Sequence, residues 1–103
     1  MLVNNAWGGN ALPITGAPFW EQPLAHWDHM FGAGVFCHVL SSRIGVRLML
    51  DQGHGLIVNT TFWDRDKYTG HFFYDLAKNA MNRMAFGMAE ELRPYGIAAV
   101  AVA

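Results

Sequence analysis

Two short apolar segments flank one strongly periodic segment, and this alternation most limits what the chain can fold into. Residues 56–61 and 97–102 are rich in aliphatic side chains and follow glycine, which is typical of buried strands. Between them, apolar residues recur at helical spacing over residues 73–92. An apolar strand, a helix and a second apolar strand in this order predict a right-handed crossover onto a parallel sheet.

The pattern extends towards the N-terminus. Residues 2–3 predict the end of another strand, and residues 27–50 predict a helix in which Gly32 and Gly34 weaken the first half. Residues 7–23 hold three glycines and three prolines, which indicates an extended loop. The order strand, helix, strand, helix, strand predicts the α/β class. We expect a partial Rossmann-like, doubly wound parallel sheet, covered on both faces.

Composition excludes several kinds of function. Of the 103 residues, 52% are apolar, which excludes a disordered chain. Seven basic and eight acidic residues give a net charge of −1, so no basic excess would neutralise nucleic-acid phosphates or anionic lipids. No uninterrupted apolar run approaches the ~18 residues of a membrane span. We therefore expect neither a nucleic-acid partner nor a membrane partner. The single cysteine, Cys37, fits a reducing compartment, and we expect a cytoplasmic protein.

A tyrosine and a lysine give the strongest chemical signal. Tyr74 and Lys78 are four positions apart, so they share one face of a helix. An ammonium near a phenol favours the phenolate and lowers its pKa from about 10, which suits a general acid or base. Thr61 ends a buried strand thirteen positions earlier, and ligands of open α/β sheets bind beyond the carboxyl ends of strands. These side chains should converge, although a Tyr–Lys pair alone is also common on exposed helix surfaces.

Four segments together resemble the central to C-terminal part of the short-chain dehydrogenase/reductase family. Leu2-Val3-Asn4-Asn5-Ala6 is similar to the family's NNAG segment, and residues 56–61 to a strand that normally ends in a serine pair. Residues 74–78 match the YxxxK helix, and residues 91–97 match the passage into the next strand. The resemblance covers essentially the whole chain and depends on the order and spacing of the four segments.

This resemblance implies hydride transfer between NAD or NADP and a small carbonyl or alcohol substrate. Tyr74 would exchange a proton with the substrate oxygen, Lys78 would lower the pKa of Tyr74 and bind the nicotinamide ribose, and Thr61 would orient the substrate oxygen. The residues implied to contact the cofactor are Asn4, Asn5, Ala6, Thr60, Tyr74 and Lys78. A homo-oligomer is implied for the full-length form.

Three positions depart from the family pattern. Trp7 stands where a glycine usually follows NNA, so its ring must point away from the cofactor path or reshape the loop. Gly34 falls where many members carry an asparagine of a proton relay, and Thr61 replaces the usual serine. Thr61 still offers a hydroxyl, but its extra methyl group restricts its rotamers.

Parts of the family pattern have no counterpart in the sequence. These are the glycine-rich phosphate turn, the residue that selects NAD or NADP, and the segment that closes over the substrate. We therefore expect residues 1–103 to be a partial NAD(P)-binding domain, a fragment of an oxidoreductase that is inactive by itself. A non-catalytic or degenerate homologue, acting only in packing or interaction, is the alternative.

Two other motifs are weaker candidates for ligand sites. His26 and His29 form an HxxH pair without an evident third ligand, so we expect no metal site. Residues 64–70 begin like a calcium loop, but the glycine falls at position seven and Asp75 occupies position twelve, so a solvated charged loop is expected. The periodic methionines of the helix, Met81, Met84 and Met88, are expected in the core or at a subunit contact.

Overall fold

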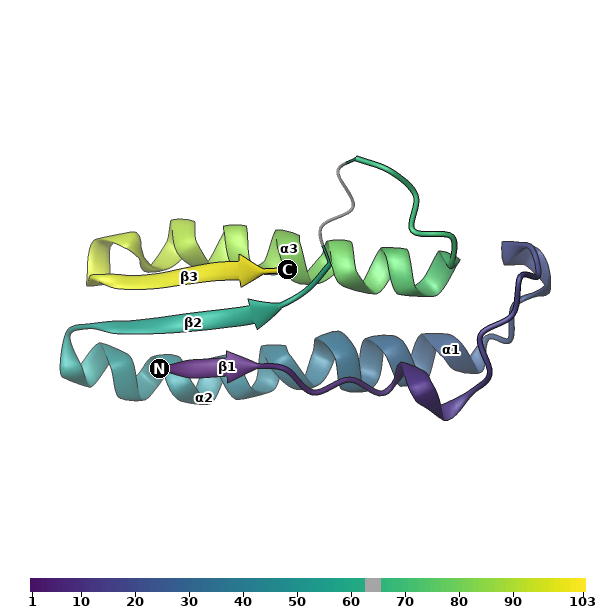
Figure 1. The fold of residues 1–103 in the computed structure, drawn as a ribbon. Helices are drawn as coiled ribbons and strands as arrows, with labels where there is room; N and C mark the ends of the chain where they lie inside the picture. The colour runs from purple at the N-terminus through teal and green to yellow at the C-terminus, as the bar shows by residue number, and fades with distance from the viewer. Residues whose placement is uncertain (63–65) are drawn as a thin grey trace.

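A three-stranded parallel sheet with long helices packed on it makes up the computed structural model, which describes residues 1–62 and 66–103 (Figure 1). The strands are β1 (Leu2–Asn4), β2 (Gly55–Thr60) and β3 (Ile97–Val102), in the spatial order β1-β2-β3. The helical elements are η1 (Gly9–Ala11), η2 (Phe19–Glu21), α1 (Ala25–Trp27), η3 (Asp28–Phe36), α2 (Cys37–Gln52), α3 (Phe72–Leu92) and η4 (Arg93–Tyr95). The predicted α/β class and order of elements are confirmed.

The helix predicted over residues 27–50 contains a segment that the sequence did not indicate. Elements α1, η3 and α2 follow one another directly, and η3 is a π-helix of nine residues that includes Gly32 and Gly34. Such wide turns are rare and are found mostly at functional sites. The helix ends at Gly53, whose φ of 79° is left-handed and whose N–H reaches the carbonyls of Met49 and Leu50.

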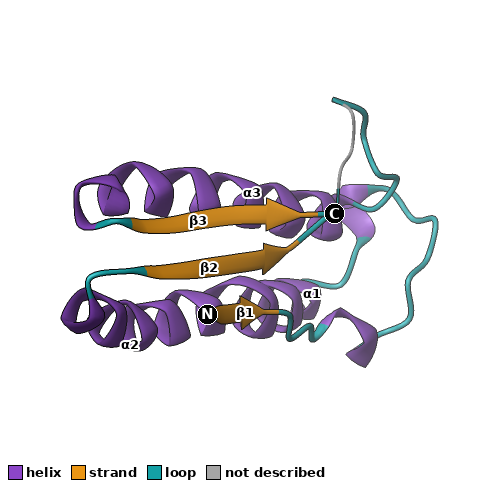
Figure 2. Ribbon diagram, turned by 60° about the vertical axis from the view of Figure 1, so that its left-hand side comes forward, coloured by secondary structure: helices purple, strands orange, loops and turns teal. Residues whose placement is uncertain are grey.

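Both long helices lie on the same side of the sheet (Figure 1, Figure 2). A right-handed crossover places its helix according to the direction in which the chain moves, and both crossovers move the same way, from β1 to β2 to β3. Cover on both faces was expected, but the helices of the described residues cover one face. The extents of 47 × 25 × 17 Å agree with one layer of helices on one sheet.

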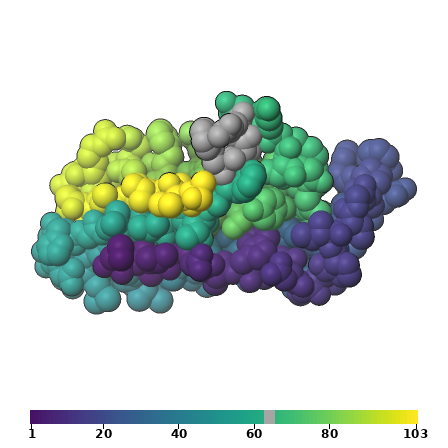
Figure 3. Space-filling model, in the orientation of Figure 1, coloured from purple at the N-terminus to yellow at the C-terminus, as the bar shows by residue number. Residues whose placement is uncertain are grey.

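The opposite face of the sheet carries apolar side chains. Val3, Val58 and Val100 are neighbours in the register of the three strands. Val3 is 49% exposed and Val100 is 42% exposed, whereas the alternate residues Ile57 and Ala99 face the helices and are buried. Figure 3 shows the three strands at the surface on this side.

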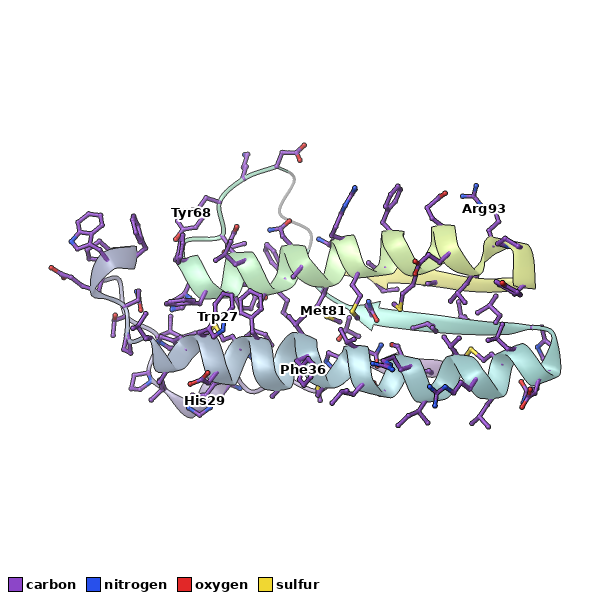
Figure 4. The ribbon with its side chains drawn as sticks, turned by 180° about the vertical axis from the view of Figure 1, so that it is seen from behind. Trp27, His29, Phe36, Tyr68, Met81 and Arg93 are labelled. Atoms are coloured by element: carbon purple, nitrogen blue, oxygen red, sulfur yellow. The ribbon has the colours of Figure 1, made fainter. Side chains whose placement is uncertain are left out.

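The core consists of two clusters of buried side chains. The first lies between the sheet and the helices and contains Met49, Ile57, Leu92, Ile97 and Ala99. The second lies where η3 meets the first turns of α3, and contains Met30, Phe73 and Ala77. Met81, labelled in Figure 4 between the two long helices, is buried as predicted, whereas Met84 and Met88 are half-buried. The second cluster supports the candidate site.

The helical stretch Ala25–Gln52 is long and apolar enough, by length and composition alone, to cross a membrane. Uninterrupted apolar runs do not reveal this stretch, because polar and charged residues interrupt it. A helix that packs on a sheet can meet the same criteria. The exposed apolar side chains of this stretch are Trp27, Phe36, Val39, Leu40, Ile44, Leu48 and Leu50. The absence of a membrane partner therefore stays a prediction.

The charged loop predicted before α3 is described only in part. Residues 63–65, which include Trp63 and the start of the proposed calcium-like segment, lie outside the described residues. In the remainder, the backbone N–H of Thr69 donates to Asp75 Oδ1 at 3.0 Å. This bond joins the end of the loop to the first turns of α3.

Candidate active site

The three predicted catalytic residues come together where β2 ends and α3 begins. Thr61 follows the last residue of β2, and Tyr74 and Lys78 lie in the first two turns of α3. The Thr61 hydroxyl donates a hydrogen bond to the carbonyl of Lys78 at 2.9 Å, and the Thr61 N–H bonds to the carbonyl of Val102, also at 2.9 Å. Thr61 therefore joins β2, β3 and α3, and its hydroxyl donates its hydrogen to a helix carbonyl.

Tyr74 is held at both its backbone and its ring. Its N–H donates to Nδ1 of His71, the residue that caps α3, at 3.2 Å. Its ring meets the ring of Trp7 edge-on at 5.5 Å and that of Phe62 at 6.1 Å, measured between centroids. Tyr74 is half-buried beside these rings.

Burial reverses the pKa shift that the sequence suggested for Tyr74. Desolvation raises the pKa of Tyr74 and lowers the pKa of Lys78. The Lys78 ammonium lies 5.8 Å from the centre of the Tyr74 ring and closer to Trp7. The expected lowering of the Tyr74 pKa by Lys78 is therefore wrong for this structure, in which desolvation sets the direction of the shift.

Trp7 points inward instead of across the loop surface. Lys78 Nζ lies over its ring, 4.4 Å from the ring centre. A Cβ at Gly34 would come within 2.6 Å of the ring, and a Cβ at Gly9 would also overlap it. The ring therefore occupies space that two glycines leave open, and the departures at positions 7 and 34 are structurally linked.

Asn4 belongs to a buried polar network that sequence reasoning missed. Its Nδ2 donates to Asn59 Oδ1 at 2.8 Å and to Ser42 Oγ at 3.0 Å, and its Oδ1 accepts from Ser41 Oγ at 2.9 Å. Asn59 Nδ2 donates to the carbonyl of Met81 at 3.3 Å. The network joins β1, α2, β2 and α3, so the Asn4 side chain faces the helices and not the sheet edge. Asn59 inside an apolar strand was the available signal.

The other predicted cofactor residues lie at the carboxyl edge of β1 and β2. Asn5 and Ala6 are exposed, and the Thr60 hydroxyl lies 2.8 Å from Asn5 Oδ1. His38, which the sequence did not single out, donates from Nε2 to the carbonyl of Ala6 at 2.8 Å. An amide group and a hydroxyl group thus meet at this edge of the sheet.

The two histidines of the HxxH pair lie in different surroundings. His26 is fully buried and meets His71 edge-on at 5.0 Å, whereas His29 is half-buried. Burial and the nearby His26 lower the pKa of His71. Among residues 1–62 and 66–103, no three His, Cys, Asp or Glu side chains are grouped as metal ligands would be.

Comparison with known proteins establishes the family. The family model described as "short chain dehydrogenase" matches residues 1–103. The chain belongs to the short-chain dehydrogenase family. It is 36% identical to dehydrogenase/reductase SDR family member 1 of Mus musculus, over 99% of this chain and 33% of that protein. The chain thus spans about a third of the length of the curated relatives it matches.

Solved structures of other dehydrogenases share the fold. Acetoin dehydrogenase from Enterobacter cloacae is 36% identical with a TM-score of 0.81, over 99% of this chain and 41% of that chain. A gluconate 5-dehydrogenase from Burkholderia cenocepacia J2315, solved with NADP and tartrate, gives a TM-score of 0.84 at 24% identity, over 97% of this chain and 38% of that chain. These matches show a Rossmann-type fold, and the family match supports an oxidoreductase.

Proposed function

We propose that this chain carries the catalytic residues of an oxidoreductase that transfers a hydride between NAD or NADP and a small carbonyl or alcohol. The observation that carries the proposal is the convergence of Thr61, Tyr74 and Lys78 at the carboxyl edge of the sheet in a short-chain dehydrogenase. The bound cofactor supplies the hydride. The residues of this chain position the reactants and move the proton.

Tyr74 is the proton donor and acceptor in this proposal. A tyrosine phenol, whose ordinary pKa of about 10 is raised here by burial, is protonated at neutral pH and can donate to a carbonyl oxygen during reduction. In the oxidation direction the phenol must first lose its proton.

Thr61 and Lys78 orient the reactants. The Thr61 hydroxyl, which donates to the Lys78 carbonyl in this structure, turns towards the substrate oxygen when that oxygen is the stronger acceptor. The Lys78 ammonium binds the nicotinamide ribose beside Tyr74. Asn5, Thr60 and the backbone of Asn4 and Ala6 form the remaining wall of the cofactor groove, and both NAD and NADP stay open.

We also propose the wider context of residues 1–103. They form part of an NAD(P)-binding domain, and the full-length protein is a cytoplasmic homo-oligomer. The exposed apolar groove of about 280 Å³ between α2 and α3 supports the oligomer, since Val39, Val46, Met84 and Met88 line it. The single cysteine, Cys37, supports a reducing compartment. Light scattering and cell fractionation test these two proposals.

A packing or interaction module without activity is the second candidate. The apolar sheet face around Val58 favours it, because an exposed apolar face indicates a contact surface. Steady-state assays of the full-length protein, with NADH or NADPH and a panel of small aldehydes and ketones, separate the two. Turnover that depends on Tyr74 supports the oxidoreductase, and cofactor oxidation indistinguishable from the protein-free rate supports the module.

A further inference from the structure

The ring of Trp7 is fitted into a space that the backbone keeps open. Gly34 is buried in the π-helix η3, and a Cβ there would come within 2.6 Å of the indole. Real Cβ atoms do not approach other atoms so closely, so an alanine at this position would displace the ring. Gly32 lies two residues earlier in the same helix, and a Cβ there would meet nothing within 4 Å. Of these two glycines, only Gly34 is required by the packing of Trp7.

The same ring contacts both members of the Tyr–Lys pair. Lys78 Nζ lies 4.4 Å from the ring centre, within the distance at which an aromatic face attracts a cation. The Tyr74 ring meets the indole edge-on, with an angle of 83° between the planes. Within the described residues Lys78 has no ion pair, and its ammonium lies over the ring of Trp7 and, at a longer distance, that of Tyr74.

We propose that Trp7 is a positioning residue that holds the Lys78 ammonium and the Tyr74 ring in place. Gly34, which has no side chain, leaves the space that the indole fills. This inference rests on the proposed function, in which Lys78 binds the cofactor ribose. Trp7 itself transfers no proton. It acts through Lys78 and Tyr74 by limiting the positions that their side chains adopt before the cofactor and the substrate bind.

The first test compares two replacements of Trp7 in the full-length protein. Trp7→Phe keeps an aromatic face, whereas Trp7→Leu keeps apolar volume without one. We expect Trp7→Leu to weaken NADH or NADPH binding and to lower kcat/KM by about threefold to thirtyfold, which is the range of cation–π energies. Trp7→Phe should retain most of both quantities. Equal losses in the two variants would overturn the proposal, because they would show a purely steric role.

The second test asks whether Trp7 acts through Lys78. Cofactor affinity is measured by calorimetry for Trp7→Leu, Lys78→Met and the double variant. We expect Trp7→Leu to have no further effect once Lys78 is replaced. If Trp7→Leu weakens binding by the same factor in both backgrounds, the ring only supports the fold and the proposal is wrong.

The third test uses the two glycines of η3 as a matched pair. Both substitutions add the same methyl group to the same helix, so their costs to the helix itself should be alike. Gly34→Ala should weaken cofactor binding as much as Trp7→Leu does, because its Cβ meets the indole. Gly32→Ala should leave cofactor binding within about twofold of the wild type. Similar effects of the two alanines would contradict the proposal that Gly34 specifically makes room for the Trp7 ring.

A readout independent of activity separates this inference from the proposed function. In NMR spectra, the Lys78 side-chain methylene signals should move upfield under the Trp7 ring and return to ordinary values in Trp7→Leu. Absence of that shift in the wild type overturns the positioning role whatever the activity. If the shift is present but the wild type has no cofactor-dependent turnover, the proposed function fails while the packing of Trp7 on Lys78 stands.

Discussion

Burial and hydrogen bonding set the chemistry of individual side chains at this site. The Tyr74 phenol lies among the rings of Trp7 and Phe62, and the Lys78 ammonium lies over the indole. Desolvation therefore raises the pKa of Tyr74 and lowers that of Lys78. The sequence placed the two side chains on one helix face, but four-residue spacing carries no information on how much water reaches them.

The pH dependence of catalysis follows from the direction of the Tyr74 shift. A phenol with a raised pKa keeps its proton beyond the ordinary value of about 10. We expect carbonyl reduction to be independent of Tyr74 ionisation near neutral pH and to fall as the pH rises through the raised pKa. Alcohol oxidation should rise over the same range. Steady-state rates in both directions check this, and an oxidation rate that levels off near neutral pH would contradict it.

Thr61 allows its hydroxyl and its packing to be tested separately. Thr61→Ser keeps the hydroxyl that donates to Lys78, and we expect it to retain activity. Thr61→Val keeps the branched shape without the hydroxyl. It should lose activity and about 1 kcal/mol of stability, because the Lys78 carbonyl loses one partner. Kinetics and urea unfolding of both variants provide the measurement, and equal activity would show that Thr61 only packs.

At the scale of elements, α3 was the easiest to predict from the sequence, and the helix 25–52 was predicted less completely. Over residues 73–92 the apolar period is regular, and the observed helix begins one residue earlier, at Phe72. The π-helical segment η3 was not predicted, because apolar spacing does not distinguish π-helical from α-helical hydrogen bonds; a loop also packs closely against this segment. A Cβ at Gly8 would lie 2.6 Å from the carbonyl of His29, which shows how closely that loop approaches.

His71 links the stability of α3 to pH. Its pKa is lowered in the folded state by burial and by His26, and its Nδ1 accepts the N–H of Tyr74. The stabilising contribution is therefore complete above the unfolded pKa of about 6.5 and is lost as the pH falls through the lower folded value.

A pair of variants at position 71 tests this cap. His71→Asn keeps a capping acceptor that does not titrate, so its unfolding free energy should depend less on pH between about 7.5 and 5.5. His71→Ala lacks the acceptor and should be less stable by about 1 kcal/mol even at pH 7.5. Urea unfolding at several pH values gives these energies. The same pH dependence in wild type and His71→Asn would assign the effect to another group.

At the scale of the whole molecule, the sequence predicted which segments meet but not which surfaces they leave open. The order of strands and helices indicated a parallel sheet, and the three catalytic candidates converge as expected. Helices were expected on both faces of the sheet, because apolar strands of parallel sheets are usually buried on both faces. The order β1-β2-β3 instead places both crossovers on one side. The buried network of Asn4 and Asn59 depends on this tertiary arrangement, so no local pattern revealed it.

The open sheet face determines how residues 1–103 should behave when produced alone. Val3, Val58 and Val100 form an apolar row on that face. We expect this polypeptide to self-associate at micromolar concentration, as exposed apolar faces and strand edges do. Sedimentation velocity over a range of concentrations is the measurement. A monomer that melts cooperatively and binds NADH or NADPH with micromolar affinity would show a self-sufficient module.

In the proposed mechanism, Tyr74 moves the proton at a site assembled by β2 and α3. Replacement of Tyr74 by phenylalanine in the full-length protein tests it most directly, because the ring and its contacts with Trp7 remain. We predict that kcat falls by about 10²- to 10⁴-fold, the usual contribution of a general acid, while the Kd for NADH or NADPH stays within about threefold of the wild type. Lys78→Ala, in contrast, should also weaken cofactor binding. A loss of less than about tenfold in Tyr74→Phe would contradict the account and remove Tyr74 from the catalytic role.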